Sequence, residues 1–179
     1  VTPIPQVVPL PPNFSIGFNQ GMNLGDVDDD GDLDFVMGLA NIEQGTSHDQ
    51  INVLMYINDG NGNFSEQSAA RFDTSDYGGS RIAAGNAKLV DVDYDNDLDV
   101  VLFNKFNDGL PGQVPGKFTY MLLNDSTGHF RYSKAHSFRM LGPSDSIGDE
   151  LDISDLDGDG VYDLWFGLGA EARRNLLNS

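Results

Sequence analysis

Short hydrophobic runs alternate with clusters of glycine, asparagine and aspartate along most of the chain. Four of these runs are rich in β-branched and aromatic side chains and end at turn-forming residues; they cover residues 52–57, 89–92, 98–104 and 118–123. This pattern is typical of β-strands. The sequence "NDGNGNF" at 58–64 is rich in residues that tolerate positive φ, so it predicts a hairpin turn.

The predicted strands form an up-and-down series. Residues 64–69 and 130–135 are expected to be the return strands that follow the hairpin turns, which gives four strands per unit. The chain lacks a convincing amphipathic helix. The nearest candidate, residues 169–177, aligns with a strand of the other units, so an all-β fold is predicted.

An acidic run recurs at a regular interval. "DVDDDGDLDF" begins at Asp26, "DVDYDNDLDV" at Asp91 and "DLDGDGVYDL" at Asp155, at offsets of 65 and 64 residues. Such a period indicates a repeat architecture. The predicted organisation is an extended N-terminal arm or edge strand at 1–20, complete units at 21–83 and 84–147, and a partial unit at 148–179.

Composition and charge narrow the function. The chain has 179 residues, and a hydrophobic content of 39% is too high for a disordered acidic tail. A formal net charge of −18 argues against binding to nucleic acid or to an anionic membrane surface. The absence of cysteine excludes disulfides and thiolate metal sites. No apolar stretch approaches the roughly 20 residues of a membrane span, so membrane insertion is not expected.

The acidic runs share the spacing D-x-D-x-D-G-x-x-D, in which Asn96 replaces the glycine of the second run. Carboxylates at positions 1, 3 and 5 can turn inward, because the glycine or asparagine at position 6 lets the backbone reverse. The carbonyl at position 7 then faces the same point, and the aspartate at position 9 completes the set of ligands. About six hard oxygen ligands suit Ca²⁺ better than Mg²⁺ or Zn²⁺, so about three calcium sites are predicted. The predicted ligands are Asp26, Asp28, Asp30, Asp32 and Asp34; Asp91, Asp93, Asp95, Asp97 and Asp99; and Asp155, Asp157, Asp159, Val161 and Asp163, those at position 7 through the carbonyl.

Two other calcium motifs do not fit. An EF-hand needs a bidentate glutamate at position 12, where this chain has Met37, Leu102 and Phe166. The calcium-binding β-helix needs GGxGxD tracts, which the sequence lacks.

The acidic loop between two strands, the "DFVMG" or "DLWFG" that follows it, and "NDGNGNF" two strands on together resemble the FG-GAP/VCBS repeat family, the calcium-binding blades of integrin α-chain-like β-propellers. The resemblance covers most of residues 21–179. It implies four-stranded antiparallel blades around an axis, here two complete and one truncated. It also implies extracellular or cell-surface recognition and adhesion, with a glycan or protein as ligand.

Two and a half blades do not close a propeller, which typically has 4–8 blades. Three arrangements stay open: a fragment of a longer propeller, a ring completed by further copies of the chain, or an open stack. We expect calcium to be a structural staple of the loops. Residues Tyr77 and Phe106 are candidates for a contact surface because they lie in loops that the units do not share.

Two other classes of function stay open beside recognition. One is an accessory or catalytic part of a polysaccharide-active enzyme, for which Asp149, Glu150 and Asp152 are the uncommitted acids. No convincing catalytic constellation is present, so the expectation is a non-enzyme. The other class is a self-assembling surface or filament protein. The three histidines, His48, His129 and His136, lack metal-ligand spacing, and surface or turn roles are expected for them.

Overall fold

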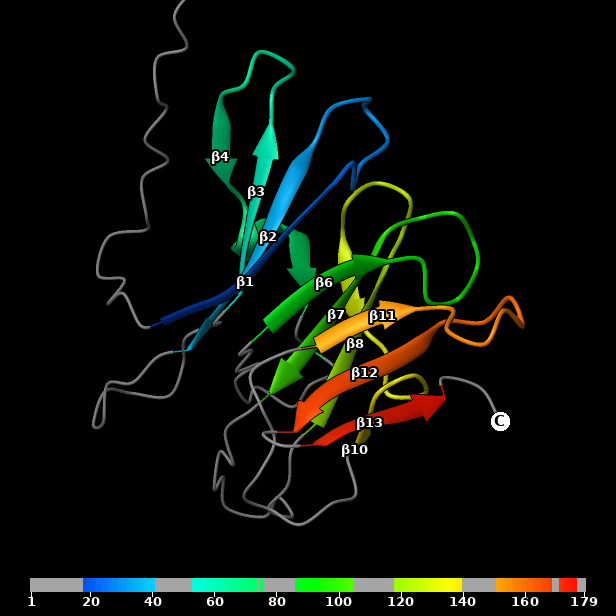
Figure 1. The fold of residues 1–179 in the computed structure, drawn as a ribbon. Coiled ribbons are helices and arrows are strands. Elements are labelled where there is room, and N and C mark those ends of the chain that lie inside the picture. The colour runs from blue at the N-terminus through cyan, green and yellow to red at the C-terminus, as the bar shows by residue number, and fades with distance from the viewer. Residues whose placement is uncertain are drawn as a thin grey trace, which may run out of the picture.

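The chain forms three β-sheets that follow one another along the sequence in the computed structural model (Figure 1). The structure describes residues 18–40, 53–73, 75, 86–104, 118–139, 151–168 and 171–176. The first sheet is four-stranded and antiparallel, with neighbours in chain order: β1 (Phe18–Gly25), β2 (Asp34–Ala40), β3 (Val53–Asn58) and β4 (Phe64–Glu66). This sheet confirms the predicted up-and-down order.

The second sheet repeats the first and adds to it. It contains β6 (Asn86–Val90), β7 (Asp99–Asn104), β8 (Phe118–Asn124) and β9 (Phe130–Tyr132) in the same antiparallel order. The strand β5 (Phe72–Asp73) joins β9 in parallel, and β10 (Phe138–Arg139) pairs with β8. The sheet is therefore six-stranded and mixed, which the prediction of four antiparallel strands did not include.

The third sheet contains β11 (Leu151–Ser154), β12 (Asp163–Leu168) and β13 (Glu171–Leu176), all antiparallel. The candidate helix at 169–177 is thus a strand at 171–176, as its alignment with the other units predicted. Residues 1–17, which hold most of the predicted N-terminal arm, lie outside the described residues.

The return strands are shorter than predicted, and the prediction of strands through 69 and 135 was wrong. After β4 the chain forms one helical turn, α1 (Ser68–Arg71), and after β9 it turns at 134–136. At these points a serine hydroxyl, and not the backbone of a return strand, pairs with a backbone N–H of β3 or β8. The Ser68 hydroxyl accepts the Met55 N–H at 2.8 Å, and the Ser137 hydroxyl accepts the Met121 N–H at 3.0 Å. No helix among the described residues has the length and apolar character to cross a membrane.

The second sheet packs on both neighbours through alternate residues of its strands. Val100 and Leu102 of β7 belong to the core shared with the first sheet, whereas Val101 and Phe103 belong to the core shared with Leu164 of the third sheet. Successive side chains of a strand point to opposite faces, so one strand can serve two cores. This explains why residues 100–103 are all apolar rather than alternating with polar residues.

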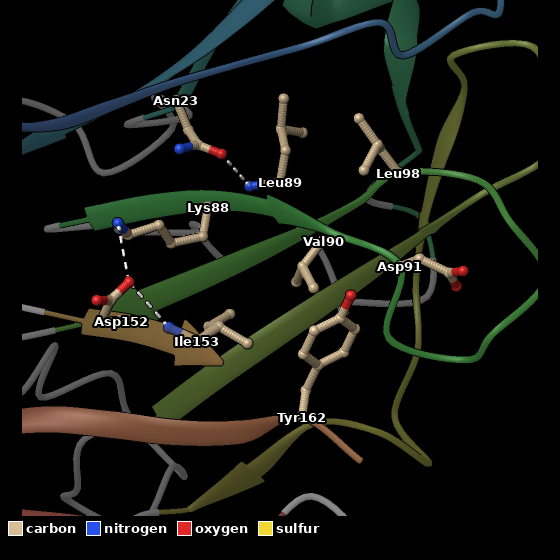
Figure 2. Close-up of a pocket in the computed structure, with 9 residues that line it drawn as sticks. All are labelled: Asn23, Lys88, Leu89, Val90, Asp91, Leu98, Asp152, Ile153 and Tyr162. Atoms are coloured by element: carbon tan, nitrogen blue, oxygen red, sulfur yellow. Dashed lines mark hydrogen bonds and ion pairs between the residues drawn. The ribbon is translucent and has the colours of Figure 1, made fainter. Parts of the chain in front are cut away.

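The strands β1, β6 and β11, one from each sheet, converge around a cavity of about 320 Å³ (Figure 2). Polar groups in its wall pair with one another. The Lys88 ammonium lies 3.5 Å from the Asp152 carboxylate, and the Asn23 side-chain oxygen accepts the Leu89 N–H at 2.8 Å. These contacts join the second sheet to the third and to the first. The cavity therefore lies where the three sheets meet, and these polar groups of its wall are already paired.

Candidate metal centres

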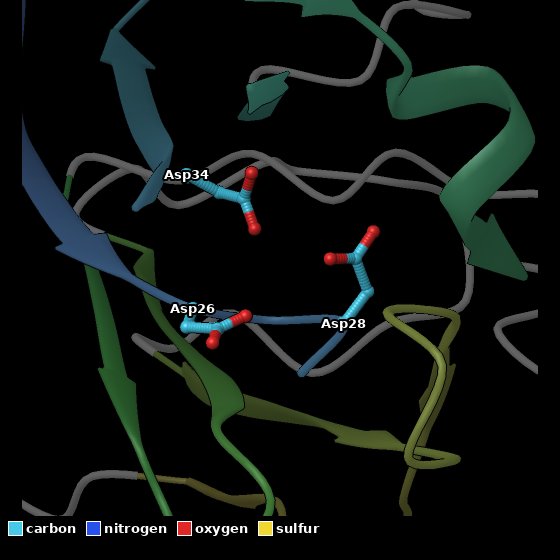
Figure 3. Close-up of side chains that lie close together, drawn as sticks. All are labelled: Asp26, Asp28 and Asp34. Carbon is cyan, nitrogen blue, oxygen red and sulfur yellow. The ribbon is translucent and has the colours of Figure 1, made fainter. Parts of the chain in front are cut away.

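Each acidic loop connects two neighbouring antiparallel strands: β1 and β2, β6 and β7, and β11 and β12. We call residues 26–34 the first acidic loop, 91–99 the second and 155–163 the third. In every loop the carboxylates of positions 1, 3 and 9 come together, each offering one oxygen within 4.8 Å of the others. Figure 3 shows the first group, with its three carboxylates turned toward a common space. The groups are Asp26, Asp28 and Asp34; Asp91, Asp93 and Asp99; and Asp155, Asp157 and Asp163.

The loops reverse through left-handed backbone at two positions. Position 6 has φ of 93° at Gly31, 77° at Asn96 and 86° at Gly160, so the asparagine adopts the conformation that was predicted for it. Position 4 is also left-handed, with φ of 57° at Asp29 and 64° at Tyr94. In the third loop position 4 is Gly158, with φ of 76°, so the sequence held a signal for this second left-handed position that the sequence analysis missed.

Backbone amides orient the carboxylate at position 1. Asp26 accepts the N–H groups of Asp30 at 3.1 Å and Gly31 at 2.9 Å. The same bonds recur from the fifth and sixth residues of the other loops, at 3.1 and 3.0 Å to Asp91 and at 3.2 and 2.9 Å to Asp155. The loop backbone thus fixes the position 1 carboxylate in one orientation. The carboxylates at positions 3 and 9 complete the group of three.

The carboxylate at position 9 is buried in all three loops. Asp34 and Asp99 are 0% exposed and Asp163 is 1% exposed. Asp34 accepts the N–H groups of Val27 at 3.1 Å and Asn58 at 2.9 Å. Burial raises the pKa of Asp34, and it raises the pKa of Asp99 to about 6, although backbone N–H donors oppose the rise at both. A cation beside these carboxylates would offset the cost of burying their charge.

Positions 5 and 7 remain predicted ligands. The position 5 carboxylates, Asp30, Asp95 and Asp159, are not members of the three groups; each accepts the N–H of position 7, at 3.1, 3.0 and 2.9 Å. At position 7 the side chains point elsewhere. Asp97 accepts a hydrogen bond from the Ser126 hydroxyl in the turn after β8, while the Asp32 carboxylate faces Gly60 in the matching turn after β3.

The first loop meets the requirements of a hard divalent cation. The Asp28 oxygen Oδ1 is buried and has no hydrogen-bond partner among the described residues. A buried carboxylate oxygen without a donor is costly, and a bound cation supplies the missing partner. The grouped ligands are all oxygen atoms, which suits calcium and does not favour zinc.

Two asparagines support the position 9 carboxylates, and the sequence analysis missed their role. The N–H groups of Asn58 and Asn124 donate to Asp34 and Asp99, at 2.9 and 2.8 Å. Their side-chain oxygens accept the N–H groups of Gly62 and Gly128, which closes the hairpin turn. The signal was present, because both asparagines follow an apolar strand at an offset of 66 residues. It was interpreted only as turn chemistry.

The other singled-out residues do not form a second cluster among the described residues. Asp152 is exposed and pairs with Lys88. The side chains of His129 and His136 contact Thr127 and Ser133 within turns, at 2.9 and 2.8 Å, which fits the turn roles predicted for them. The remaining candidates, Tyr77, Phe106, Asp149, Glu150 and His48, lie outside the described residues.

No family model matches this chain, and no curated protein matches it. The inference about function therefore depends on the acidic loops and on the sheets that position them.

Proposed function

We propose that this protein is a calcium-binding β-module whose ions stabilise the loops at one end of each sheet. One observation carries the proposal. Three segments at regular intervals build the same group of carboxylates with the same backbone donors at the same positions. Burying a carboxylate costs free energy that a solvated acidic turn avoids, and all three loops bury their last carboxylate.

Calcium fits better than other common cations. The ligands are oxygens, and the loop supplies a mixture of carboxylate and carbonyl groups in a flexible arrangement, which Ca²⁺ accepts with 6–8 ligands. Mg²⁺ requires a near-ideal octahedron and retains its waters, and Zn²⁺ prefers histidine or cysteine. Most grouped carboxylates are also oriented by the protein, so the ion is a structural staple rather than a catalytic centre.

The wider proposal is a propeller-type recognition or adhesion module of the FG-GAP/VCBS kind. Its support is the resemblance of the repeat and the sheet-on-sheet packing through alternate strand residues. On this proposal the protein acts outside the cell or at its surface, where calcium is abundant, and binds a glycan or protein ligand without turnover. Further blades come from a longer chain or from other copies of this one.

Native mass spectrometry of the full chain tests the metal proposal. The calcium-free protein should take up three Ca²⁺ ions, and Asp93→Asn should take up two because it removes a ligand from one loop only. Asp152→Asn is the matched control, since it removes an exposed acid outside the loops and should leave three ions bound. Failure of the wild-type chain to bind calcium, or equal uptake by Asp93→Asn, would refute the proposal.

A further inference from the structure

Arg71 is tightly held between the first and second sheets. It ends α1, and its side chain is only 11% exposed. Nε donates to Gln67 at 3.1 Å, Nη1 to the Thr127 carbonyl at 2.7 Å, and Nη2 to Asp28 Oδ2 at 2.9 Å. The guanidinium therefore connects a carboxylate of the first acidic loop to the hairpin turn of the second sheet.

The fit around this guanidinium is close. A Cβ atom built on Gly128 would lie 2.3 Å from Arg71 Nη1 and 3.0 Å from the Cβ of Asp28. Any side chain at position 128 would therefore displace the arginine. The arginine and the turn that receives it form a specific contact rather than a loose surface ion pair.

Arg71 also distinguishes the first site from the second. Asp28 directs one oxygen at the guanidinium, and its other oxygen, Oδ1, has no hydrogen-bond partner within the part of the chain that the structure describes. Asp93, which has the same position in the second loop, is exposed, and no described lysine or arginine pairs with it. The first loop has six aspartates and the second has five, so Arg71 brings the two loops to the same net charge. The difference lies in position: the guanidinium contacts a carboxylate of the site directly, whereas the additional aspartate of the first loop, Asp29, is exposed.

We propose that Arg71 is an internal counter-ion of the first acidic site. It joins the first two sheets in the absence of metal and lowers the affinity of the first site for a divalent cation below that of the second. This inference rests on the proposed function. It predicts an order of filling in which the second site binds calcium before the first.

Arg71 affects calcium binding at the first site in two opposite ways: its charge repels the cation, and its hydrogen bond orders Asp28. The repulsion should be the larger effect. The guanidinium contacts a carboxylate of the site directly, and both side chains are largely shielded from water, so salt screens their field weakly. Ordering contributes less, because backbone N–H groups already hold Asp26 and Asp34. Removing the positive charge should therefore strengthen calcium binding while weakening the contact between sheets.

The test measures both effects in the full chain. In a chain that carries Asp93→Asn and Asp157→Asn, the second and third sites each lack one ligand and only the first site keeps all of its aspartates. Calorimetry with CaCl₂ then reports the affinity of the first site. Arg71→Met keeps the apolar stem and should raise that affinity about tenfold, while it lowers the melting temperature of the calcium-free protein. Arg71→Lys keeps the charge and should not raise the affinity. Lys88→Met, which removes a cation that pairs with Asp152 and not with the first acidic loop, is the control and should leave the affinity unchanged.

A second measurement does not depend on the folding of any arginine variant. In the chain with Arg71 intact, Asp26→Asn should abolish a weaker binding step and Asp91→Asn a tighter one, because these residues have the same place in their loops. Equal or weaker affinity in Arg71→Met, or the reverse order of steps, overturns the inference and leaves the proposed function intact. Absence of calcium uptake by the wild-type chain overturns both.

Discussion

The backbone N–H of Asn124 donates a 2.8 Å hydrogen bond to the buried carboxylate of Asp99, and the side chain of the same asparagine reaches the neighbouring sheet. Its Nδ2 group donates to the Val27 carbonyl in the first acidic loop at 2.8 Å and to the Leu98 carbonyl in the second at 3.1 Å. One residue thus supports a position 9 carboxylate and holds two acidic loops side by side.

Asn124→Ala should destabilise the protein by about 2–4 kcal/mol, because it leaves two carbonyls and the Gly128 N–H without their partner in a buried place. Urea denaturation of the calcium-loaded chain measures this loss. Asn58→Ala is the matched control. Asn58 has the same position in the first sheet, but its Nδ2 makes only a longer, exposed bond of 3.3 Å to Leu33, so its loss should be smaller. Equal losses in the two variants would contradict the bridging role of Asn124.

The sequence predicted the strands and the acidic loops well, for a physical reason. Strands such as 98–104 are marked by apolar runs, and the loops by a spacing that recurs three times, so local chemistry and repetition agree. The left-handed conformation of Asn96 was predictable because asparagine is one of few residues that adopt it without great cost.

Contacts between distant segments could not be predicted in this way. Arg71 meets Asp28 across 43 residues, and Asn124 meets Val27 across 97 residues. Neither contact leaves a periodic trace in the sequence, since each depends on how one sheet packs on the next. The additional strands β5 and β10 were missed for a different reason: each pairs over only two residues, which is too short a stretch to show a strand pattern.

Gly38→Ala should destabilise the protein by about 1–3 kcal/mol through a steric clash between sheets. A Cβ at this position of β2 would lie 3.0 Å from the backbone of Asn86 and 3.1 Å from the Ala87 nitrogen, and backbone atoms cannot rotate away. Without that clash alanine would stabilise the strand slightly, because glycine loses more entropy on folding. Thermal denaturation shows whether Gly38→Ala lowers or raises the stability of the protein. An increase in stability would mean that the two sheets do not approach this closely.

The calcium-free protein should become more stable as the pH falls from about 7 to about 5. Burial raises the pKa of Asp99 to about 6 in the folded state, whereas an unfolded aspartate has a pKa near 3.9. Between these values the folded state binds more protons than the unfolded state, so stability is lost as the pH rises through this window. The raised pKa values of Asp34 and Asp93 act in the same direction.

Calcium should reverse this dependence, because protons compete with the ion for the same carboxylates. Melting temperatures of dialysed and calcium-loaded protein, measured at about pH 5 and about pH 7, give the two slopes. Asp99→Asn should flatten the slope of the calcium-free protein, since it removes the group with the largest upward shift. A calcium-free protein that loses stability on acidification over this range would contradict the assignment.

Tyr94 and Tyr162 connect the second and third acidic loops. Their rings stack with centroids 5.8 Å apart and planes 8° from parallel, and the Tyr94 hydroxyl accepts the Tyr162 N–H at 2.8 Å. Tyr94 adopts a left-handed backbone with φ of 64°, which is unfavourable for a bulky residue, so the contact must offset some strain.

Tyr94→Ala should therefore cost about 1–2 kcal/mol, and Tyr94→Phe no more than about half of that. The phenylalanine variant keeps the ring contact and loses only an acceptor whose donor, at the exposed backbone of Tyr162, can bond to water. A double-mutant cycle with Tyr162→Ala in urea denaturation should yield a coupling of about 0.5–1.5 kcal/mol. Coupling near zero would mean that the aromatic contact does not join the two loops, and that the apolar core around Val101 and Leu164 and the Lys88–Asp152 ion pair hold the second and third sheets together.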